Sequence, residues 1–232
     1  MSRKTELFIP DTSTDTDRTT QQYVYERLRY AIMVGAIQPG TALTMRGLAE
    51  AMDLSPTPVR EAVRRLSSEN AILIRKNRRI AIPRMTSGRF EELVAMRIHL
   101  EVHAAERALP YVADVKIAEM KGFDDRMDQA IAERDLNALT TLNHSFHRTL
   151  YTINPDQVAM PLIESLWLQL GPFQRQVIEL LDEFYEIDRH KEILSALTAR
   201  DAVALARATR RDIQETVARA GRKLLAAEST AS

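Results

Sequence analysis

The sequence predicts a mainly α-helical protein in two parts, the first carrying one small β-hairpin and the second built from helices alone. From residue 21 onward, apolar residues recur at helical spacing, and β-like runs occur only at 71–74 and 80–82. The 7 Gly and 9 Pro residues gather between the helical segments, where such residues interrupt a helix. These observations favour a helix-rich fold in two domains.

The first domain is expected over residues 19–85, after a flexible tail at 1–18 that is rich in Thr, Asp and Ser. Its three helices are predicted at 21–34, 44–52 and 55–69. Thr44 and Ser55 are good N-cap residues for the second and third helices. Asn70 follows the third helix, where a left-handed residue is common and Asn is tolerated.

A basic-tipped β-hairpin closes the first domain. Its strands are predicted at Ala71–Ile74 and Ile80–Ile82, and the tip between them reads Arg-Lys-Asn-Arg-Arg. Pro83 ends the second strand. Three helices followed by such a hairpin form a winged helix-turn-helix, in which the third helix enters the major groove of DNA and the hairpin meets the backbone.

The second domain is expected over residues 89–228, after a short linker at 86–88, and it shows no strand signal. Six helices are predicted there, at roughly 89–109, 113–134, 136–152, 156–181, 183–199 and 201–227. The sequence therefore predicts an all-α helical bundle for this domain.

Composition limits the classes of protein. The chain of 232 residues is 45% apolar and 28% charged, which is typical of globular domains. It has no Cys, which excludes disulfides and thiolate metal sites and fits a reducing cytoplasm. No apolar run approaches the roughly 18 residues of a membrane helix, and the N-terminus lacks a signal-peptide core. We expect a cytoplasmic protein with no membrane partner.

Charge is unevenly distributed although the net charge is zero. Residues 19–85 hold 11 Arg and Lys against 5 Asp and Glu, whereas residues 86–232 carry a net charge of −5. A chance surface imbalance remains an alternative. The asymmetry favours a basic, nucleic-acid-binding domain joined to a second, acidic domain.

Three short sequence motifs in the first domain resemble the pattern of the GntR family of bacterial regulators. The family pattern is matched by VGAIQPG at 34–40, LA at 48–49 and SPTPVREA at 55–62, and the match extends over residues 21–83. The resemblance implies double-stranded operator DNA as the partner. It implies DNA contacts by Arg46, Thr57 and Arg60, supported by Ser55 and Lys76.

Two departures from the GntR pattern affect these contacts. Pro56 stands where family members often have Arg, so one contact to DNA is expected to be missing. Asn77 stands where the hairpin tip often has Gly, and Asn can adopt the same left-handed turn. We therefore expect the hairpin to be retained.

In the second domain Arg97 lies on an apolar helix face with Leu93, Leu100 and Ala104. A guanidinium on such a face is expected to be buried, and burial of a charge requires a partner. One interpretation is an ion pair with Glu101, one turn later. The other interpretation is that the guanidinium of Arg97 binds the carboxylate of an effector through two hydrogen bonds.

Two histidines also lie on apolar stripes. Asn143 and His147 are one turn apart on the stripe of the third helix of this domain, and His190 shares a face with Leu194 and Leu197. Asp212 lies at the edge of the apolar face of the last helix. A lone inward His is usually a hydrogen-bonded core residue, but together these four make a mixed N and O donor set that suits Zn, Ni or Mn.

The second domain resembles the FCD subfamily of these regulators over residues 88–227. The resemblance is carried by Arg97 with Glu101, by the Phe146-His147 pair, by RHKEIL at 189–194 and by ARDA at 199–202. It implies a helical effector-binding and dimerisation domain. It also implies effectors that are small carboxylates, such as lactate-like acids, sugar acids, amino acids or acyl derivatives.

The resemblance further implies a divalent metal ion at Asn143, His147, His190 and Asp212. This chain departs from the family's metal ligands twice, because Asn143 replaces an Asp and Asp212 replaces a His. Metal affinity should therefore be lower. The alternative is a pocket of Arg97, Asn143, His147 and His190 that binds the effector directly, without metal.

The sequence thus predicts a homodimeric transcription regulator, a repressor by expectation, that binds an inverted-repeat operator. An enzyme is disfavoured because the chain lacks a Cys nucleophile, a Gly-rich phosphate loop, a His-Glu-x-x-His run and a Gly-x-Ser-x-Gly elbow. A structural nucleoid protein would not need an Arg, two His and an Asp turned into a helical core. Effector, operator and regulated genes stay open.

Overall fold

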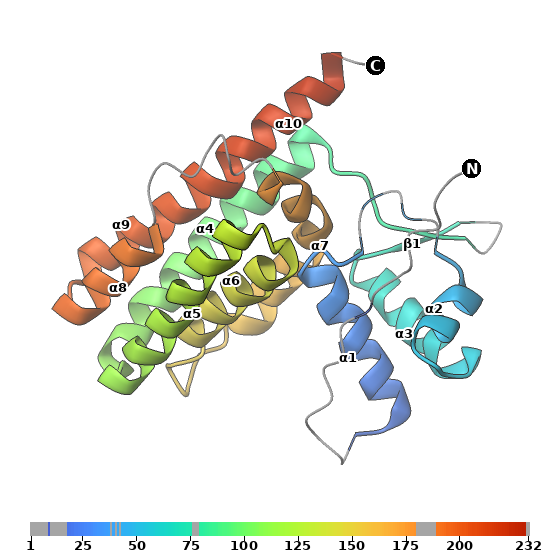
Figure 1. Cartoon of the computed structure of the whole chain (residues 1–232), viewed down its shortest axis with the longest axis horizontal. Helices are drawn as coiled ribbons and strands as arrows, with labels where there is room; N and C mark the ends of the chain where they lie inside the picture. The colour runs from blue at the N-terminus through green and yellow to red at the C-terminus, as the bar shows by residue number, and fades with distance from the viewer. Residues whose placement is uncertain are drawn as a thin grey trace. The chain divides into compact units, whose positions relative to one another are not determined.

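A computed structural model describes residues 9, 18–37, 39, 41, 43–75, 79–179 and 189–230 of the chain. The fold is mainly α-helical with one two-stranded antiparallel sheet (Figure 1), as the sequence predicted. The chain divides into two compact units. One contains Met1–Arg84 with Trp167–Phe173, and the other contains Met85–Leu166 with Gln174–Ser232.

The first unit begins with three helices, α1 (Thr20–Met33), α2 (Met45–Ala51) and α3 (Pro56–Ser68). Side-chain hydrogen bonds cap the N-termini of the first two helices. Thr19 forms a capping box with Gln22, and the Thr44 side chain accepts a hydrogen bond from the Gly47 amide. The third starts at Ser55 with Pro56 in its first turn, where the missing N–H costs nothing. α1 and α2 both pack against α3.

The β-hairpin follows α3 and consists of β1 (Leu73–Ile74) and β2 (Ile80–Ala81). The strands are antiparallel, with Leu73 opposite Ala81 and Ile74 opposite Ile80. Asn70 has a φ of 58° between α3 and the hairpin, which confirms the left-handed residue expected there. The tip of the hairpin, residues 76–78, lies outside the described residues, and so does most of the 1–18 segment.

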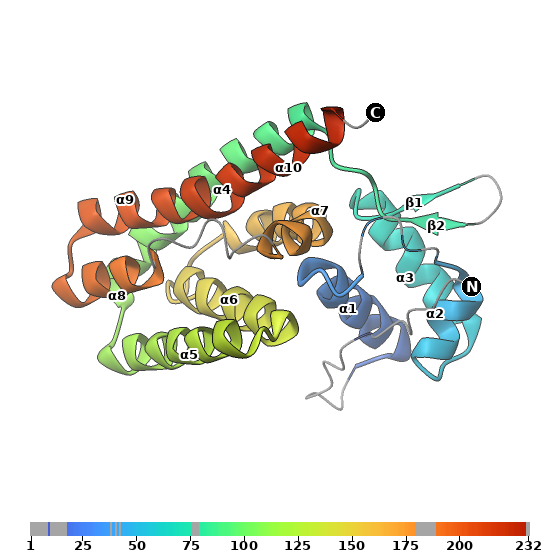
Figure 2. The ribbon, with the colours of Figure 1, turned by 45° about the horizontal axis from the view of Figure 1, so that its top comes forward.

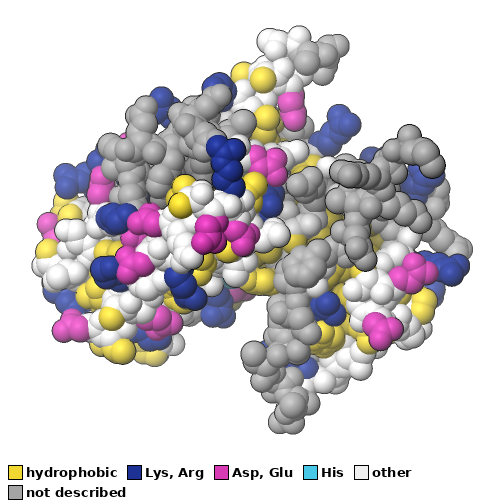
Figure 3. Space-filling model, viewed as in Figure 1, with side chains coloured by type: hydrophobic (Ala, Val, Ile, Leu, Met, Phe, Trp, Pro, Cys, Tyr) yellow, Lys and Arg dark blue, Asp and Glu magenta, His cyan; other side chains and the backbone are white. Residues whose placement is uncertain are grey.

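The second unit is a bundle of helices. In chain order these are α4 (Ser87–Ala108), η1 (Leu109–Tyr111), α5 (Asp114–Glu133), α6 (Leu136–Tyr151), α7 (Met160–Ile178), α8 (Arg189–Ala199), α9 (Ala202–Asp212), η3 (Ile213–Ala218) and α10 (Arg219–Thr230). Of α7, only Met160–Leu166 and Gln174–Ile178 belong to this unit. Figure 2 shows α5 beside α6 and α8 beside α9, and α4 packs along α9. The charged side chains on the face of this unit seen in Figure 3 are mixed in sign.

Helix boundaries differ from those predicted in several places. The linker expected at 86–88 is shorter, because Thr86 caps α4 and Ser87 and Gly88 already form its first turn. The start expected at residue 183 for the helix that ends at 199 lies outside the described residues. The segment expected as one helix over 201–227 is divided into α9, the π-helix η3 and α10. The helix expected from residue 156 begins only at Met160, after turns at 152–156. No helix of the described residues is long and apolar enough to cross a membrane.

Candidate functional site

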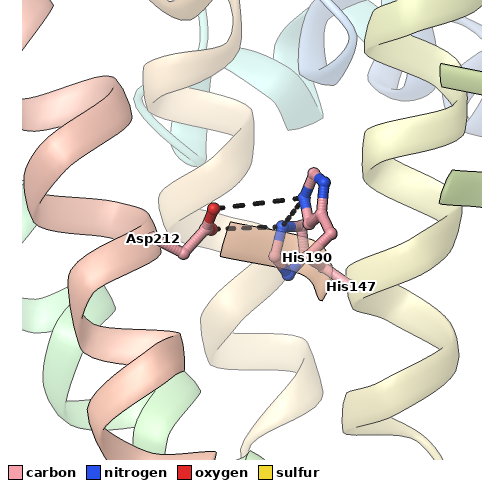
Figure 4. Close-up of side chains that lie close together, drawn as sticks. All are labelled: His147, His190 and Asp212. Atoms are coloured by element: carbon pink, nitrogen blue, oxygen red, sulfur yellow. Dashed lines mark hydrogen bonds and ion pairs between the residues drawn. The ribbon is translucent and has the colours of Figure 1, made fainter. Parts of the chain in front are cut away.

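Three helices of the second unit bring His147, His190 and Asp212 together in the bundle core (Figure 4). One donor atom from each lies within 4.8 Å of the others. His147 Nε2 is 3.3 Å from both His190 Nε2 and Asp212 Oδ2, and His190 Nε2 is 4.0 Å from Asp212 Oδ1. All three side chains are buried. The grouping expected from the sequence is therefore present.

Local helix patterns explain why these residues meet. His147 lies on α6 between the fully buried Phe146 and Leu150, so the apolar face of α6 turns it inward. His190 is on α8, one turn before the buried Ile193. Asp212 is the last residue of α9 before the π-helix, a helix form often found at functional positions.

The other ring nitrogen of His147 faces a chain of buried polar groups. His147 Nδ1 lies 3.3 Å from the hydroxyl of Tyr151, and that hydroxyl donates to Glu101 Oε2 at 3.1 Å. Burial raises the pKa of Tyr151 well above its ordinary value, and the charge of Glu101 raises it further, so the phenol keeps its proton. The chain continues to Arg97, which is paired with Glu101.

Arg97 is the buried cation that the sequence indicated, with only 3% of its surface exposed. Its Nε donates to Glu101 Oε1 at 2.5 Å and one terminal nitrogen donates to Oε2 at 3.2 Å. Burial disfavours the charged form, but the Glu101 charge and its hydrogen bonds outweigh this and raise the pKa of Arg97. The ion pair considered from the sequence is therefore present, and it occupies two of the three guanidinium nitrogens.

The remaining terminal nitrogen of Arg97, NH1, is buried without a hydrogen-bond partner among the described residues. Arg97 also borders a cavity of about 50 Å³, enough for several water molecules. The residues lining this cavity are Arg97, Leu139, Asn143, His147, Gln174, Ile178, His190, Asp212, Thr216 and Val217. The cavity thus brings together all five residues expected to bind effector or metal, and it adds two polar side chains, Gln174 and Thr216, that sequence reasoning missed.

Burial lowers the pKa of His147 to about 3, because desolvation outweighs the attraction of Asp212 for the charged ring. The ring is therefore neutral at neutral pH and has a lone pair to offer. In the unfolded chain the same imidazole has a pKa near 6.5 and takes up a proton below that pH. Because the unfolded state then binds more protons, lowering the pH below about 6.5 should weaken folding.

We expect this one group to reduce the free energy of unfolding by about 1.4 kcal/mol per pH unit between pH 6.5 and 4.5. Urea unfolding followed by circular dichroism, with a chelator present, measures the slope. The His147→Gln variant removes the titrating group and should flatten the profile over the same range. Identical slopes for His147→Gln and the parent protein would contradict the assigned cause.

Four of the five residues expected to contact DNA are described, and they are exposed at the surface of the first unit. Ser55, Thr57 and Arg60 are exposed in and before the first turns of α3, and the Ser55 side chain makes no capping hydrogen bond. Arg46, at the start of α2, is largely exposed and pairs with Glu50 at 2.7 Å. Lys76 lies outside the described residues.

Comparison with known proteins gives matches across both units. The FCD domain matches residues 92–215, and the family described as bacterial regulatory proteins, gntR family, matches residues 20–82. The HTH-type transcriptional regulator McbR of Escherichia coli is 29% identical over 75% of this chain and 80% of its own length. The gluconate operon transcriptional repressor of Bacillus subtilis is 26% identical over 79% of this chain and 77% of its own.

A solved structure, E. coli McbR/YncC, superposes with a TM-score of 0.82, covering 89% of this chain and 99% of that one at 25% identity. The matched families and relatives are transcriptional regulators rather than enzymes. The FCD match alone spans more than half of the 232 residues. The chain therefore belongs to the GntR family of bacterial transcription regulators, with an FCD domain following its DNA-binding domain.

Proposed function

We propose that this regulator is a ligand-responsive repressor that binds an inverted-repeat operator as a homodimer in the cytoplasm and is released or modulated by a small carboxylate. Residues 19–85 would bind the DNA, and residues 89–228 would bind the effector and dimerise. The observation that carries the proposal is the cavity of the helical bundle, where an Arg97 nitrogen lies with two imidazoles and a carboxylate. A domain serving dimerisation alone would not need such costly buried groups.

DNA reading is assigned to the start of α3. The exposed hydroxyl groups of Ser55 and Thr57 can hydrogen-bond to phosphates and base edges. The guanidinium of Arg60 can donate two hydrogen bonds, to O6 and N7 of a guanine. Arg46 on α2 and Lys76 in the hairpin are assigned to the phosphate backbone. One recognition helix covers too few base pairs for specificity in a genome, which favours a dimer on a repeated half-site.

The donor set fits a divalent cation. His147, His190 and Asp212 already have donor atoms within 4.8 Å of one another, and His147 is held neutral. Asn143 borders the same cavity and is assigned as the fourth donor. Imidazole, carboxylate and amide donors suit Zn, Ni or Mn. A bound cation would supply a positive charge that attracts an anionic oxygen of the effector.

The effector is proposed to be a small acid whose carboxylate binds between Arg97 and the cluster. The unsatisfied NH1 of Arg97 is the donor aimed at it, with His147, His190 and Asn143 lining the same cavity. A cavity of about 50 Å³ admits a compact head group rather than a long chain. Since one relative is named for a gluconate operon, sugar acids are included among the compounds to test.

Selection of bound sequences from a pool of random DNA tests the proposed operator binding. If the protein binds as a two-fold dimer, the selected sequences should contain an inverted repeat. Arg60→Ala should then weaken operator binding by about 1–3 kcal/mol and relax preference at one base position. Lys76→Ala should weaken all sequences alike and flatten the salt dependence. Lys116→Ala, an exposed change on α5, is the control and should leave the affinity unchanged. Unaltered affinity and base preference in Arg60→Ala would contradict the assigned role of α3.

A further inference from the structure

A further acidic group, Asp124 of α5, lies behind His190 and is not accounted for by the proposed binding site. Its side chain is only 2% exposed. Its Oδ1 is 3.5 Å from His190 Nδ1, the ring nitrogen opposite the one that faces His147. That oxygen accepts no hydrogen bond that meets ordinary geometry from the described residues. A buried carboxylate in this position requires a reason.

The simplest alternative explanation is that Asp124 is buried there because it forms an ion pair with a lysine. Lys191 Nζ is 4.0 Å from Asp124 Oδ2, but the same ammonium is 2.9 Å from Oδ2 of the exposed Asp128, which it contacts more closely. The Lys191 side chain is itself 55% exposed, and such pairs contribute little to stability. Lys191 therefore does not explain why Asp124 is kept in the core.

The chemistry of the two facing atoms decides the protonation of the ring. An ionised carboxylate can only accept a hydrogen bond, so a neutral imidazole beside it is stabilised with its proton on the facing nitrogen. Placing the proton on Nδ1 leaves the lone pair on Nε2. His190 Nε2 is the atom that lies 3.3 Å from His147 Nε2 and 4.0 Å from Asp212 Oδ1, at the centre of the cluster.

We propose that Asp124 is a positioning residue that holds the proton of His190 on Nδ1 and so directs the Nε2 lone pair into the cluster with His147 and Asp212. The proposal deepens the proposed function and, where metal is concerned, rests on it. A ligating imidazole commonly donates its other N–H to a carboxylate, which fixes the ring and strengthens the ligand, and loss of such a partner typically weakens metal binding 10- to 100-fold.

The first experiment needs neither metal nor effector. Nitrogen-15 NMR of the imidazoles in the full-length, chelator-treated protein, with His190→Gln used to assign the signals, reports which nitrogen of His190 carries the proton. We expect Nδ1–H in the parent protein. Asp124→Asn removes the charge, and Asp124→Leu removes the hydrogen-bond acceptor altogether, so the proton should move toward Nε2, most completely in Asp124→Leu. A parent protein with its proton on Nε2, or an Asp124→Leu variant with no change, would overturn the proposal.

Matched variants exclude a merely structural effect. Asp128→Asn removes the exposed carboxylate one turn further along α5, and Lys191→Met removes the shared ammonium. Both should leave the His190 tautomer as in the parent protein. If Lys191→Met shifted the proton as Asp124→Asn does, the lysine and not the imidazole would be the partner that matters.

Zinc titration against a chromophoric chelator then measures the consequence. Asp124→Asn should bind Zn²⁺ 10- to 100-fold more weakly than the parent protein, and Asp128→Asn within about twofold of it. Equal zinc affinities for Asp124→Asn and the parent would overturn the link between Asp124 and the metal. If the parent protein binds no Zn²⁺, the metal site of the proposed function is wrong. The NMR measurement of the His190 tautomer would still test the role of Asp124, because it needs no metal.

Discussion

Replacing Arg97 by Ala is expected to destabilise the FCD domain by about 3–5 kcal/mol, because Arg97 is only 3% exposed and neutralises a buried carboxylate. The substitution leaves the Glu101 carboxylate, which is 0% exposed, without its cation in the core. Tyr151 would still donate a hydrogen bond to that carboxylate, at 3.1 Å, but would not neutralise its charge. Urea unfolding of the full-length protein, followed by circular dichroism, measures the loss.

The double variant Arg97→Met/Glu101→Gln is the matched control, because it removes both charges and keeps a polar partner for Tyr151. Replacing a whole buried ion pair is often neutral or stabilising, so this variant should unfold close to the parent protein. A single Arg97→Ala variant as stable as the parent would contradict the buried charge pair. The double variant is therefore the one to use when the role of Arg97 toward a ligand is tested.

Removing either histidine of the cluster is expected to abolish stabilisation by a divalent cation. At a free Zn²⁺ concentration of 100 times its dissociation constant, one bound ion per chain should stabilise the parent protein by about 2.7 kcal/mol. His147→Ala and His190→Ala should each lose this increment, since each removes one donor atom of the buried set. Elemental analysis of untagged protein, followed by thermal unfolding with and without Zn²⁺, measures both occupancy and effect.

Surface histidines provide the control for that experiment. His99 and His103 are one turn apart on α4 and are both exposed, so they could bind Zn²⁺ adventitiously. The variant His99→Ala/His103→Ala should keep the whole stabilisation. Loss of stabilisation in this variant, with His147→Ala unaffected, would place the ion at the surface and leave the core pocket without metal.

Most of the fold follows from patterns that the sequence displays openly. Helical spacing predicted the helices of both domains, and the preference of Asn for left-handed conformations placed Asn70 correctly at a φ of 58°. The π-helix after Asp212 was missed, because residues 213–218 continue an ordinary amphipathic pattern and nothing in them marks a change of hydrogen-bond register. The predicted single helix over 201–227 was wrong for that reason.

The candidate site was predictable to different degrees. His147 and His190 stand out because imidazoles interrupt apolar stripes, whereas Asp212 was identified mainly through the family resemblance. Asp124 was missed among the several acidic residues of α5. A signal for it does exist, since it shares a helix face with the buried Met120 and Met127, at i−4 and i+3.

Operator binding in the presence of an effector tests the central claim most directly, namely that the buried pocket controls the DNA-binding domain. A panel of lactate, gluconate, amino acids and short acyl acids, with Zn²⁺ present, first identifies the acid that most raises the unfolding temperature. Anisotropy titration of the selected operator then compares the parent protein with Arg97→Met/Glu101→Gln. We predict a 5- to 150-fold change in operator affinity for the parent, and less than a twofold change for the double variant. An acid that stabilises the parent without altering its operator affinity, or one that alters both proteins equally, would contradict the account.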